Sequence, residues 1–397
     1  EIGVRLVGSE MCIRDRTLSR YGTDKYYNNG TWAATIGPGY VSGWTGPGWI
    51  YRVWSGIPNP DLKWETTAQA DLGIDMAFFN RRLRVALDVY DKQTSDLLRQ
   101  RNLALSSSYD KMWVNDGKIQ NRGFEATIDA DIISTPDWHL GSTFVFSMNR
   151  NKVKDLGNTV ESGLMTDEMT GMLYEYSGNS LEQYRDYTNI LAIGKPVNVF
   201  YGYRVNGIVQ TVNEGIDAGL TGDYAQPGEF KYMDLDGNGS INEGDKCIIG
   251  DPNPDFTASL NLDLTWKNWN LNVFLNGVFG NDVLNTQKFG QPNSDPLRWT
   301  KDNPTNDYPS LRDGRQAKIS DWWIEDGSFL RIQNVTLGYT FNFKKSILNK
   351  LHLYANVANL YTFTSFKGYD PEVELNGIYS GGYPRLRKWT FGLDLTF

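Results

Sequence analysis

The sequence alternates between apolar and polar residues up to its last position. Within Thr390–Phe397 one face carries Phe391, Leu393, Leu395 and Phe397, and the other carries Thr390, Gly392, Asp394 and Thr396. The last strand of a soluble domain usually runs into a frayed polar tail. A transmembrane barrel must instead pair its last strand, because lipid cannot satisfy an open strand edge. The C-terminus therefore favours a barrel strand, with an ordinary amphipathic strand as the alternative.

Alternation of the same kind recurs along the chain, over the ~9–11 residues that a tilted strand needs to cross a bilayer. Besides Lys388–Phe397, the segments are Ala68–Phe78, Leu83–Asp91, Phe124–Ile132, Trp138–Met148, Ala258–Trp266, Trp269–Leu275, Phe329–Phe341 and Leu351–Phe363. Asp and Glu recur on one face, whereas the other face is nearly free of charge. A lipid-facing surface selects for this separation, because a charge at the bilayer midplane costs ~2–4 kcal/mol. The sequence predicts an all-β fold of about nine antiparallel transmembrane strands.

The connections between these segments are unequal in length. Phe79–Arg82 and Lys267–Asn268 form tight hairpin turns, whereas other connections run to tens of residues. A barrel with short periplasmic turns and long outer loops explains the difference. The alternative is a secreted β-sandwich, in which the apolar faces would be buried between two sheets. Several segments also begin or end in aromatic residues typical of membrane interfaces, including Trp138, Trp266, Trp269 and Trp389.

Strand parity places one long stretch outside the membrane. Counting back from the last strand, which ends at the periplasmic rim, makes Ala258–Trp266 run inward, and counting forward from the short turn Phe79–Arg82 makes Trp138–Met148 run outward. An even number of crossings must therefore separate these two segments. Val197–Thr211 resembles a strand, and a single crossing there would break the count. Either it stays outside or it pairs with a partner such as Tyr184–Ile193. We favour a large extracellular excursion over about residues 151–255.

The composition excludes several other classes of protein. No stretch approaches the ~20 apolar residues of a membrane helix. The net charge of −8 argues against a nucleic-acid partner, which would require a basic surface. Two cysteines are too few for a disulfide framework, and two histidines leave most metalloenzyme schemes without ligands. We find no catalytic constellation, so the chain is not expected to be an enzyme.

Residues 1–16 do not follow the pattern of the rest of the chain. They show neither strand alternation nor the apolar core of a signal peptide, and they do not begin with Met. We interpret them as a non-native leader, translated from adaptor or vector sequence, and exclude them from the predicted fold. Residues 17–397 are expected to form the barrel, and the natural protein is expected to begin further upstream.

Several motifs resemble those of one family, the SusC/RagA group of TonB-dependent outer-membrane transporters. The resembling stretches are Ile57–Thr67 (IPNPDLKWETT), Asn121–Ile128 (NRGFEATI), Phe200–Thr211, Pro227–Phe256, Trp323–Phe341 and Gly382–Phe397. The C-terminus also resembles the assembly signal of bacterial outer-membrane barrels, since its residues follow the order polar, any, Gly, any, any, apolar, any, aromatic. The resemblance extends over essentially the whole of residues 17–397.

The resemblance implies an incomplete barrel, the C-terminal part of a large one, whose N-terminal plug and TonB-contacting segment are missing here. It further implies TonB-dependent import of a bulky nutrient, an oligosaccharide or a peptide, across the outer membrane of a Gram-negative bacterium. The implied partners are a SusD-like surface lipoprotein acting as a lid, the TonB complex, outer-membrane lipid and the barrel assembly machinery. The cargo cannot be predicted from the sequence, because the loops carry no readable code.

One local motif has readable chemistry. Residues 234–245 read DLDGNGSINEGD, which places oxygen ligands at the spacing of a calcium loop. The expected Ca²⁺ ligands are Asp234, Asp236, Asn238, the carbonyl of Ser240 and Asp245. Asp245 departs from the EF-hand pattern, which has Glu at that position, and no flanking helices are apparent. The alternative is an acidic turn that binds no metal; a bound ion would stabilise an extracellular loop.

Some further residues have more than one interpretation. Trp299, Trp322 and Trp323 could stack on sugar rings, although interfacial anchoring is the favoured interpretation. Arg331 and Arg385 fall within the family-like motifs, and the sequence assigns them no role.

Overall fold

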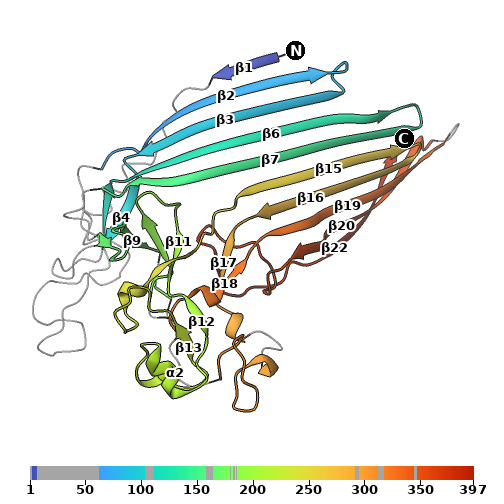
Figure 1. The fold of residues 1–397 in the computed structure, drawn as a ribbon. Helices are drawn as coiled ribbons and strands as arrows, with labels where there is room; N and C mark the ends of the chain where they lie inside the picture. The colour runs from blue at the N-terminus through green and yellow to red at the C-terminus, as the bar shows by residue number, and fades with distance from the viewer. Residues whose placement is uncertain are drawn as a thin grey trace, which may run out of the picture.

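The long strands form one curved antiparallel sheet, which Figure 1 shows with its strands side by side. The computed structural model describes residues 2–6, 62–102, 111–157, 164–178, 180–181, 184, 186–290, 295–311, 317–343 and 347–397. The order of strands in the sheet is β1-β2-β3-β6-β7-β15-β16-β19-β20-β22. After β1, the strands are β2 (Thr66–Phe78), β3 (Leu83–Ser95), β6 (Lys118–Ser134), β7 (Trp138–Asp155), β15 (Phe256–Trp266), β16 (Trp269–Phe279), β19 (Phe329–Asn342), β20 (Lys350–Thr364) and β22 (Lys388–Thr396).

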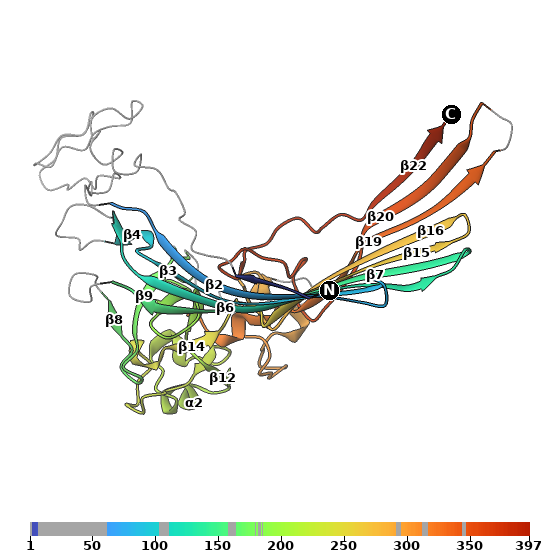
Figure 2. The same ribbon diagram turned by 90° about the horizontal axis from the view of Figure 1, so that it is seen from above.

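Every predicted membrane-length segment falls on one of these strands, so the predicted all-β antiparallel fold is confirmed. The strands are mostly longer than predicted: β7, for example, extends beyond Met148 to Asp155. In the described part of the chain the sheet runs from β1 at one edge to β22 at the other, and the two edges do not pair. Figure 2 shows this sheet as an open arc, which is the expected incomplete barrel.

Strand β1 (Ile2–Leu6) lies within the predicted leader and pairs with β2, with Leu6 opposite Leu72. The prediction that residues 1–16 form no strand is therefore wrong for this short segment. The physical reason is the free edge of β2, whose unpaired N–H and C=O groups form a template for any extended segment.

Short turns join the strands at one end of the sheet. Trp266 pairs directly with Trp269 across the two-residue turn, where Lys267 adopts a positive φ of 51° at the first central position, as the turns of tight hairpins require. At the same end, Trp138 stacks on Trp266 with ring centroids 5.3 Å apart, and Trp269 contacts Tyr339 edge to face at 4.7 Å. These half-exposed rings form the aromatic belt that the sequence predicted for a membrane interface.

The apolar face of the sheet is not covered by other parts of the described chain. Leu72 is 48% exposed, Val89 46%, Leu337 47% and Leu393 60%. All three clusters of buried apolar residues lie in the connections, outside the long strands. A β-sandwich would bury these side chains beneath a second sheet, so that alternative is wrong, and the exposed face matches the lipid-facing side of a barrel.

The stretch between β7 and β15 folds into small sheets at one end of the long strands (Figure 1). A five-stranded sheet has the order β14-β11-β10-β9-β8. Its strands are β8 (Met165–Thr166), β9 (Leu173–Ser177), β10 (Asn189–Ala192), β11 (Val199–Gly202) and β14 (Cys247–Gly250). The pair β12 (Val205–Ile208) and β13 (Phe230–Tyr232) and the helix α2 (Val212–Asp217) lie beside it.

These small sheets settle the parity question. Strands β7 and β15 are direct neighbours, so the chain between them does not cross the sheet. Residues 197–211 supply β11 and β12, and β11 pairs with β10, which lies inside the suggested partner Tyr184–Ile193. The excursion begins after Asp155 rather than near residue 151, because β7 continues further than its alternation indicates. Its extracellular location stays a prediction.

Two further small sheets lie in the other connections of the described chain. Strands β4 (Leu98–Asn102) and β5 (Lys111–Asn115) form a hairpin in the connection between β3 and β6. Strands β17 (Asp282–Asn285), β18 (Ile324–Asp326) and β21 (Ile378–Tyr379) form a three-stranded sheet. None of the helices found in the described ranges is long and apolar enough to cross a membrane.

The three tryptophans with two interpretations belong to the core of the connections. Trp323 is 3% exposed within the largest apolar cluster, and Trp322 and Trp299 pack against that cluster. The indole of Trp299 donates to Gln210 Oε1 at 2.7 Å, and that of Trp322 to the Asp307 carbonyl at 2.8 Å. The favoured interpretation as interfacial anchors is wrong, because these rings hold together loops that are far apart in sequence.

Candidate metal centre

The predicted calcium loop connects β13 to β14 within the excursion. It begins at Asp234, two residues after β13, and closes at Asp245, the last residue of the short 3₁₀ helix η3 (Glu243–Asp245). As expected, no α-helix flanks it on either side within the described residues. The frame of this loop is therefore a pair of β-strands rather than the helices of an EF-hand.

Asp234 is held by the backbone of the loop that it opens. Its two carboxylate oxygens accept the N–H groups of Gly237 and Gly239, each at 2.7 Å. Both glycines have positive φ values, 75° and 81°, which let the chain wrap around the carboxylate. The hydrogen bond from Gly239, followed by that from Gly237, lowers the pKa of Asp234, so the group is ionised as a cation ligand must be.

Asp245 closes the loop from its other end. The side chain is fully buried, its Oδ1 accepts the N–H of Leu235 at 2.7 Å, and its Oδ2 accepts the N–H of Asn242 at 2.8 Å. The bond from Leu235 joins the two ends of the loop across ten residues. The shorter carboxylate that departs from the EF-hand pattern is thus fixed by backbone donors in a tight fold.

The structure brings together the three predicted carboxylates. Asp234, Asp236 and Asp245 each offer an oxygen, and these atoms lie within 4.8 Å of one another. Asn238 and Ser240 lie in the same loop, with their oxygens already hydrogen bonded inside it. Asn238 Oδ1 accepts the N–H of Ser240 at 2.8 Å, and the Ser240 carbonyl accepts from Asn242 Nδ2 at 3.2 Å. The convergent carboxylates fit a hard divalent cation, and they are the part of the predicted site that the geometry supports most directly.

Lys246 anchors the loop to the neighbouring sheet. Its ammonium lies 2.6 Å from Asp186 and 2.7 Å from Glu243, and its side chain is only 3% exposed. The rings of Tyr176 and Tyr203 flank it at 5.8 and 5.6 Å. Burial alone would lower the pKa of this lysine, but the bonds to the two carboxylates raise it, so the amine remains charged.

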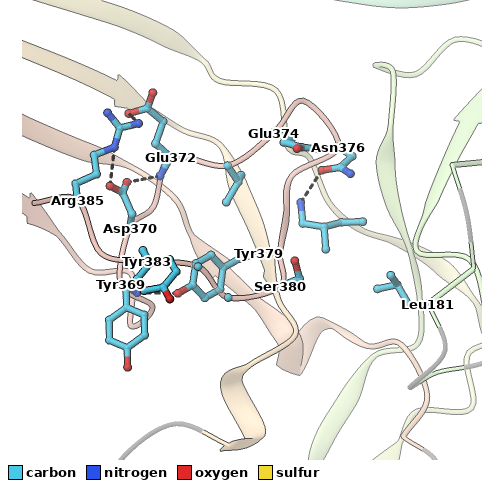
Figure 3. Close-up of a pocket in the computed structure, with 14 residues that line it drawn as sticks. Leu181, Tyr369, Asp370, Glu372, Glu374, Asn376, Tyr379, Ser380, Tyr383 and Arg385 are labelled. Atoms are coloured by element: carbon cyan, nitrogen blue, oxygen red, sulfur yellow. Dashed lines mark hydrogen bonds and ion pairs between the residues drawn. The ribbon is translucent and has the colours of Figure 1, made fainter.

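A second charged cluster was not predicted from the sequence. Arg331 in β19 is 2% exposed and donates to Asp370 at 2.8 Å, to Glu372 at 2.7 Å and to Thr362 at 2.9 Å. Arg385 contacts the same two carboxylates at 2.9 and 2.7 Å (Figure 3). The sequence contained both arginines, but their partners lie 39 and 41 residues from Arg331, so no local spacing could reveal the cluster.

Comparison with known proteins agrees with this architecture. The family model described as TonB dependent receptor-like, beta-barrel, matches residues 20–360. TonB-dependent receptor P3 of Formosa agariphila is 35% identical over 364 residues, which cover 85% of this chain and 35% of that receptor. TonB-dependent receptor SusC of Bacteroides thetaiotaomicron is 28% identical over 351 residues, covering 85% of this chain and 32% of SusC.

The solved structures that resemble the chain include the RagAB peptide transporter, with a TM-score of 0.68 at 23% identity. The match covers 90% of this chain and 38% of that chain, and at this identity it shows a shared fold. The chain thus spans about a third of the length of the curated relatives that it matches, 35% of one and 32% of another.

Proposed function

This chain belongs to the TonB-dependent receptor β-barrel family, in its SusC/RagA group, and on that basis we propose that it is part of an importer of bulky nutrients. Members of this family are outer-membrane receptors and transporters rather than enzymes. In the proposed function, an oligosaccharide or a peptide passes through the full-length barrel. A SusD-like surface lipoprotein covers the outer side, and TonB supplies energy through an N-terminal part of the longer protein.

The observation that carries the proposal is the contrast between the two faces of the sheet. The face opposite the exposed leucines is polar and internally hydrogen bonded: Asn272 donates to Asp263 at 2.7 Å, and Asn356 to Asn334 at 2.6 Å. A cavity of about 420 Å³ on the same face is lined by polar residues that include Asp71, Lys92 and Glu125. A wet inner face behind an apolar outer face is the arrangement of a barrel with a polar lumen.

Deletion of the gene for the full-length protein tests this proposal. We expect the deletion strain to lose growth on at least one oligosaccharide or peptide mixture as sole carbon source. Reintroduction of the gene should restore growth, and a copy lacking the TonB-contacting segment should not. Unchanged growth on every carbon source, together with recovery of the protein outside the outer-membrane fraction, would contradict the proposal.

We also propose that the loop 234–245 holds one Ca²⁺ with a structural role. Asp234, Asp236 and Asp245 would supply carboxylates, and Asn238 and the Ser240 carbonyl would supply neutral oxygens. Without a cation the three acidic groups repel one another at short range, so a bound ion would stabilise the loop. Magnesium is the weaker candidate, because its small octahedral shell usually keeps several waters.

Asp236→Ala should weaken calcium binding by at least about tenfold, or about 1.4 kcal/mol, because it removes one of the convergent carboxylates. Isothermal titration of the wild-type and variant proteins measures the change. Asp263→Ala is the matched control, since that carboxylate lies on the inner face of β15, outside the loop. Equal heats for the wild type and Asp236→Ala would show that the loop is not a calcium site.

A further inference from the structure

The C-terminal strand β22 is paired on one side only within the described part of the chain. Its neighbour on that side is β20, and Figure 2 shows β22 at the end of the open arc. Lipid cannot satisfy the free N–H and C=O groups of a strand edge, so another strand must cover β22 in the membrane. The side chains on the polar face of β20 and β22 indicate what that strand carries at one position.

A complete example of the relevant arrangement joins β3, β6 and β7. Tyr90 in β3 lies opposite Gly123 in β6, and Gly123 lies opposite Asn149 in β7. Because Gly123 has no side chain, the ring of Tyr90 lies across it, and a Cβ at that glycine would be 2.2 Å from Cζ and 2.3 Å from the hydroxyl oxygen of the ring. The hydroxyl thereby reaches the next strand and donates to Asn149 Oδ1 at 3.2 Å. One side chain thus connects three consecutive strands.

The same arrangement recurs at the C-terminal edge for two strands. Tyr354 in β20 lies opposite Gly392 in β22, and a Cβ at Gly392 would be 2.2 Å from Cζ and 2.4 Å from the hydroxyl oxygen of Tyr354. The ring is also held by His352, whose own ring stacks on it with centroids 5.6 Å apart. The Tyr354 hydroxyl therefore lies over the edge strand, in the position from which Tyr90 reaches β7. It forms no hydrogen bond with a described residue.

A second polar residue of the edge matches the complete example. Asn149 also donates through Nδ2 to Asn121 Oδ1 at 3.1 Å, and Asn121 lies two residues before Gly123. Thr390 lies at the corresponding position, two residues before Gly392, where it is exposed and forms no hydrogen bond with a described residue. Its hydroxyl oxygen can accept from an amide, as Asn121 does. An asparagine on the covering strand would therefore find both partners in place.

We propose that the strand covering β22 carries a short side chain with an acceptor oxygen, asparagine or aspartate, directly opposite Gly392. This strand is the first strand of the full-length barrel, and Tyr354 donates to its acceptor across β22. Closure by some strand is required of any barrel; the added element is a hydrogen bond that fixes the register of the closing pair. A slip of one residue would turn the acceptor to the lipid face.

Tyrosine-to-phenylalanine variants of the full-length receptor test this bond through unfolding in urea, followed by heat-modifiable migration on a gel. Tyr354→Phe removes the hydroxyl and keeps the ring over Gly392. At the urea midpoint of the wild type it should lower the ratio of folded to unfolded receptor about fivefold, the effect of one hydrogen bond. Tyr90→Phe, which loses the bond to Asn149, should have an effect of similar size. Tyr361→Phe is the matched control and should change nothing, because Tyr361 is 53% exposed on the opposite face of β20.

A structure of the full-length receptor shows which residue lies opposite Gly392, and its replacement by alanine completes a double-mutant cycle with Tyr354→Phe. If the two side chains share one bond, both substitutions together should lower the ratio by about as much as either alone. Equal stability of the Tyr354→Phe and Tyr361→Phe variants would overturn the proposal. A residue opposite Gly392 without an acceptor oxygen would also overturn it, as would pairing of β22 with a second copy of the receptor. Unfolding is measured without cargo, so these outcomes leave the import function to the growth experiment.

Discussion

Replacing Lys246 by Met should destabilise the excursion by about 3–5 kcal/mol, the usual cost of removing one partner from a buried ion pair. The lysine side chain is 3% exposed, and its loss leaves Asp186 and Glu243 without their shared cation. The cost should fall toward the lower end of this range, because Glu243 is 75% exposed and water can solvate it. Asp186 is only 28% exposed, so the loss of its cation accounts for most of the expected destabilisation.

Hydrogen exchange of the backbone amides in β10 and β11 measures this loss directly. In the variant, these amides should exchange through an opening reaction whose free energy is lower than in the wild type, while the amides of β19 and β20 should be unaffected. Lys195→Met is the matched control, since Lys195 is exposed and forms no ion pair with a described residue. Equal protection in the Lys246 and Lys195 variants would mean that the buried pair contributes nothing to the excursion.

The long strands could be predicted from the sequence because lipid and lumen impose one rule over many residues. In β22 the same alternation that the sequence shows places Leu393 opposite Leu353 and Asp394 opposite His352. Each face of a strand then contacts either lipid or water along its whole length. The alternation can therefore be recognised without knowing which strands pair. Register could not be predicted, because bulges such as the one at Gln333, between Ile332 and Asn334 of β19, shift it by a residue.

The excursion could not be predicted to the same depth because its strands are short and some of them, such as β10 and β11, are buried on both faces. All four residues of β11 are buried, so the strand shows no alternation. Its core joins residues distant in sequence, for example Phe230 with Trp322 and Trp323, whose rings lie 5.0 and 6.5 Å apart from it. The carboxylate loop was readable because its ligands lie within twelve residues of sequence, whereas the partners of Arg331 do not.

Leu393→Arg should impair insertion of the full-length protein into the outer membrane, whereas Thr396→Arg should have a much smaller effect. Leu393 is 60% exposed on the apolar face, and an arginine on the lipid face of a barrel costs ~2–4 kcal/mol near the midplane. Thr396 lies opposite Lys350 and shares the polar face of Asp394 and His352, where an added charge meets water.

Outer-membrane fractionation and heat-modifiable migration on a gel measure insertion of the two variants. Leu393 lies farther from the end of β22 than Thr396, so these two positions differ in depth within the membrane as well as in facing. Leu395→Arg removes the difference in depth, because Leu395 and Thr396 are adjacent in β22 and point to opposite faces. A facing effect predicts that Leu395→Arg is impaired and Thr396→Arg is not. Equal insertion defects in the Leu395 and Thr396 variants would mean that depth or local folding decides the outcome. The assignment of one face of β22 to lipid and the other to the lumen would then be wrong. Unequal defects would instead identify lipid as the solvent of the face that carries Leu72, Val89 and Leu337 across the rest of the sheet.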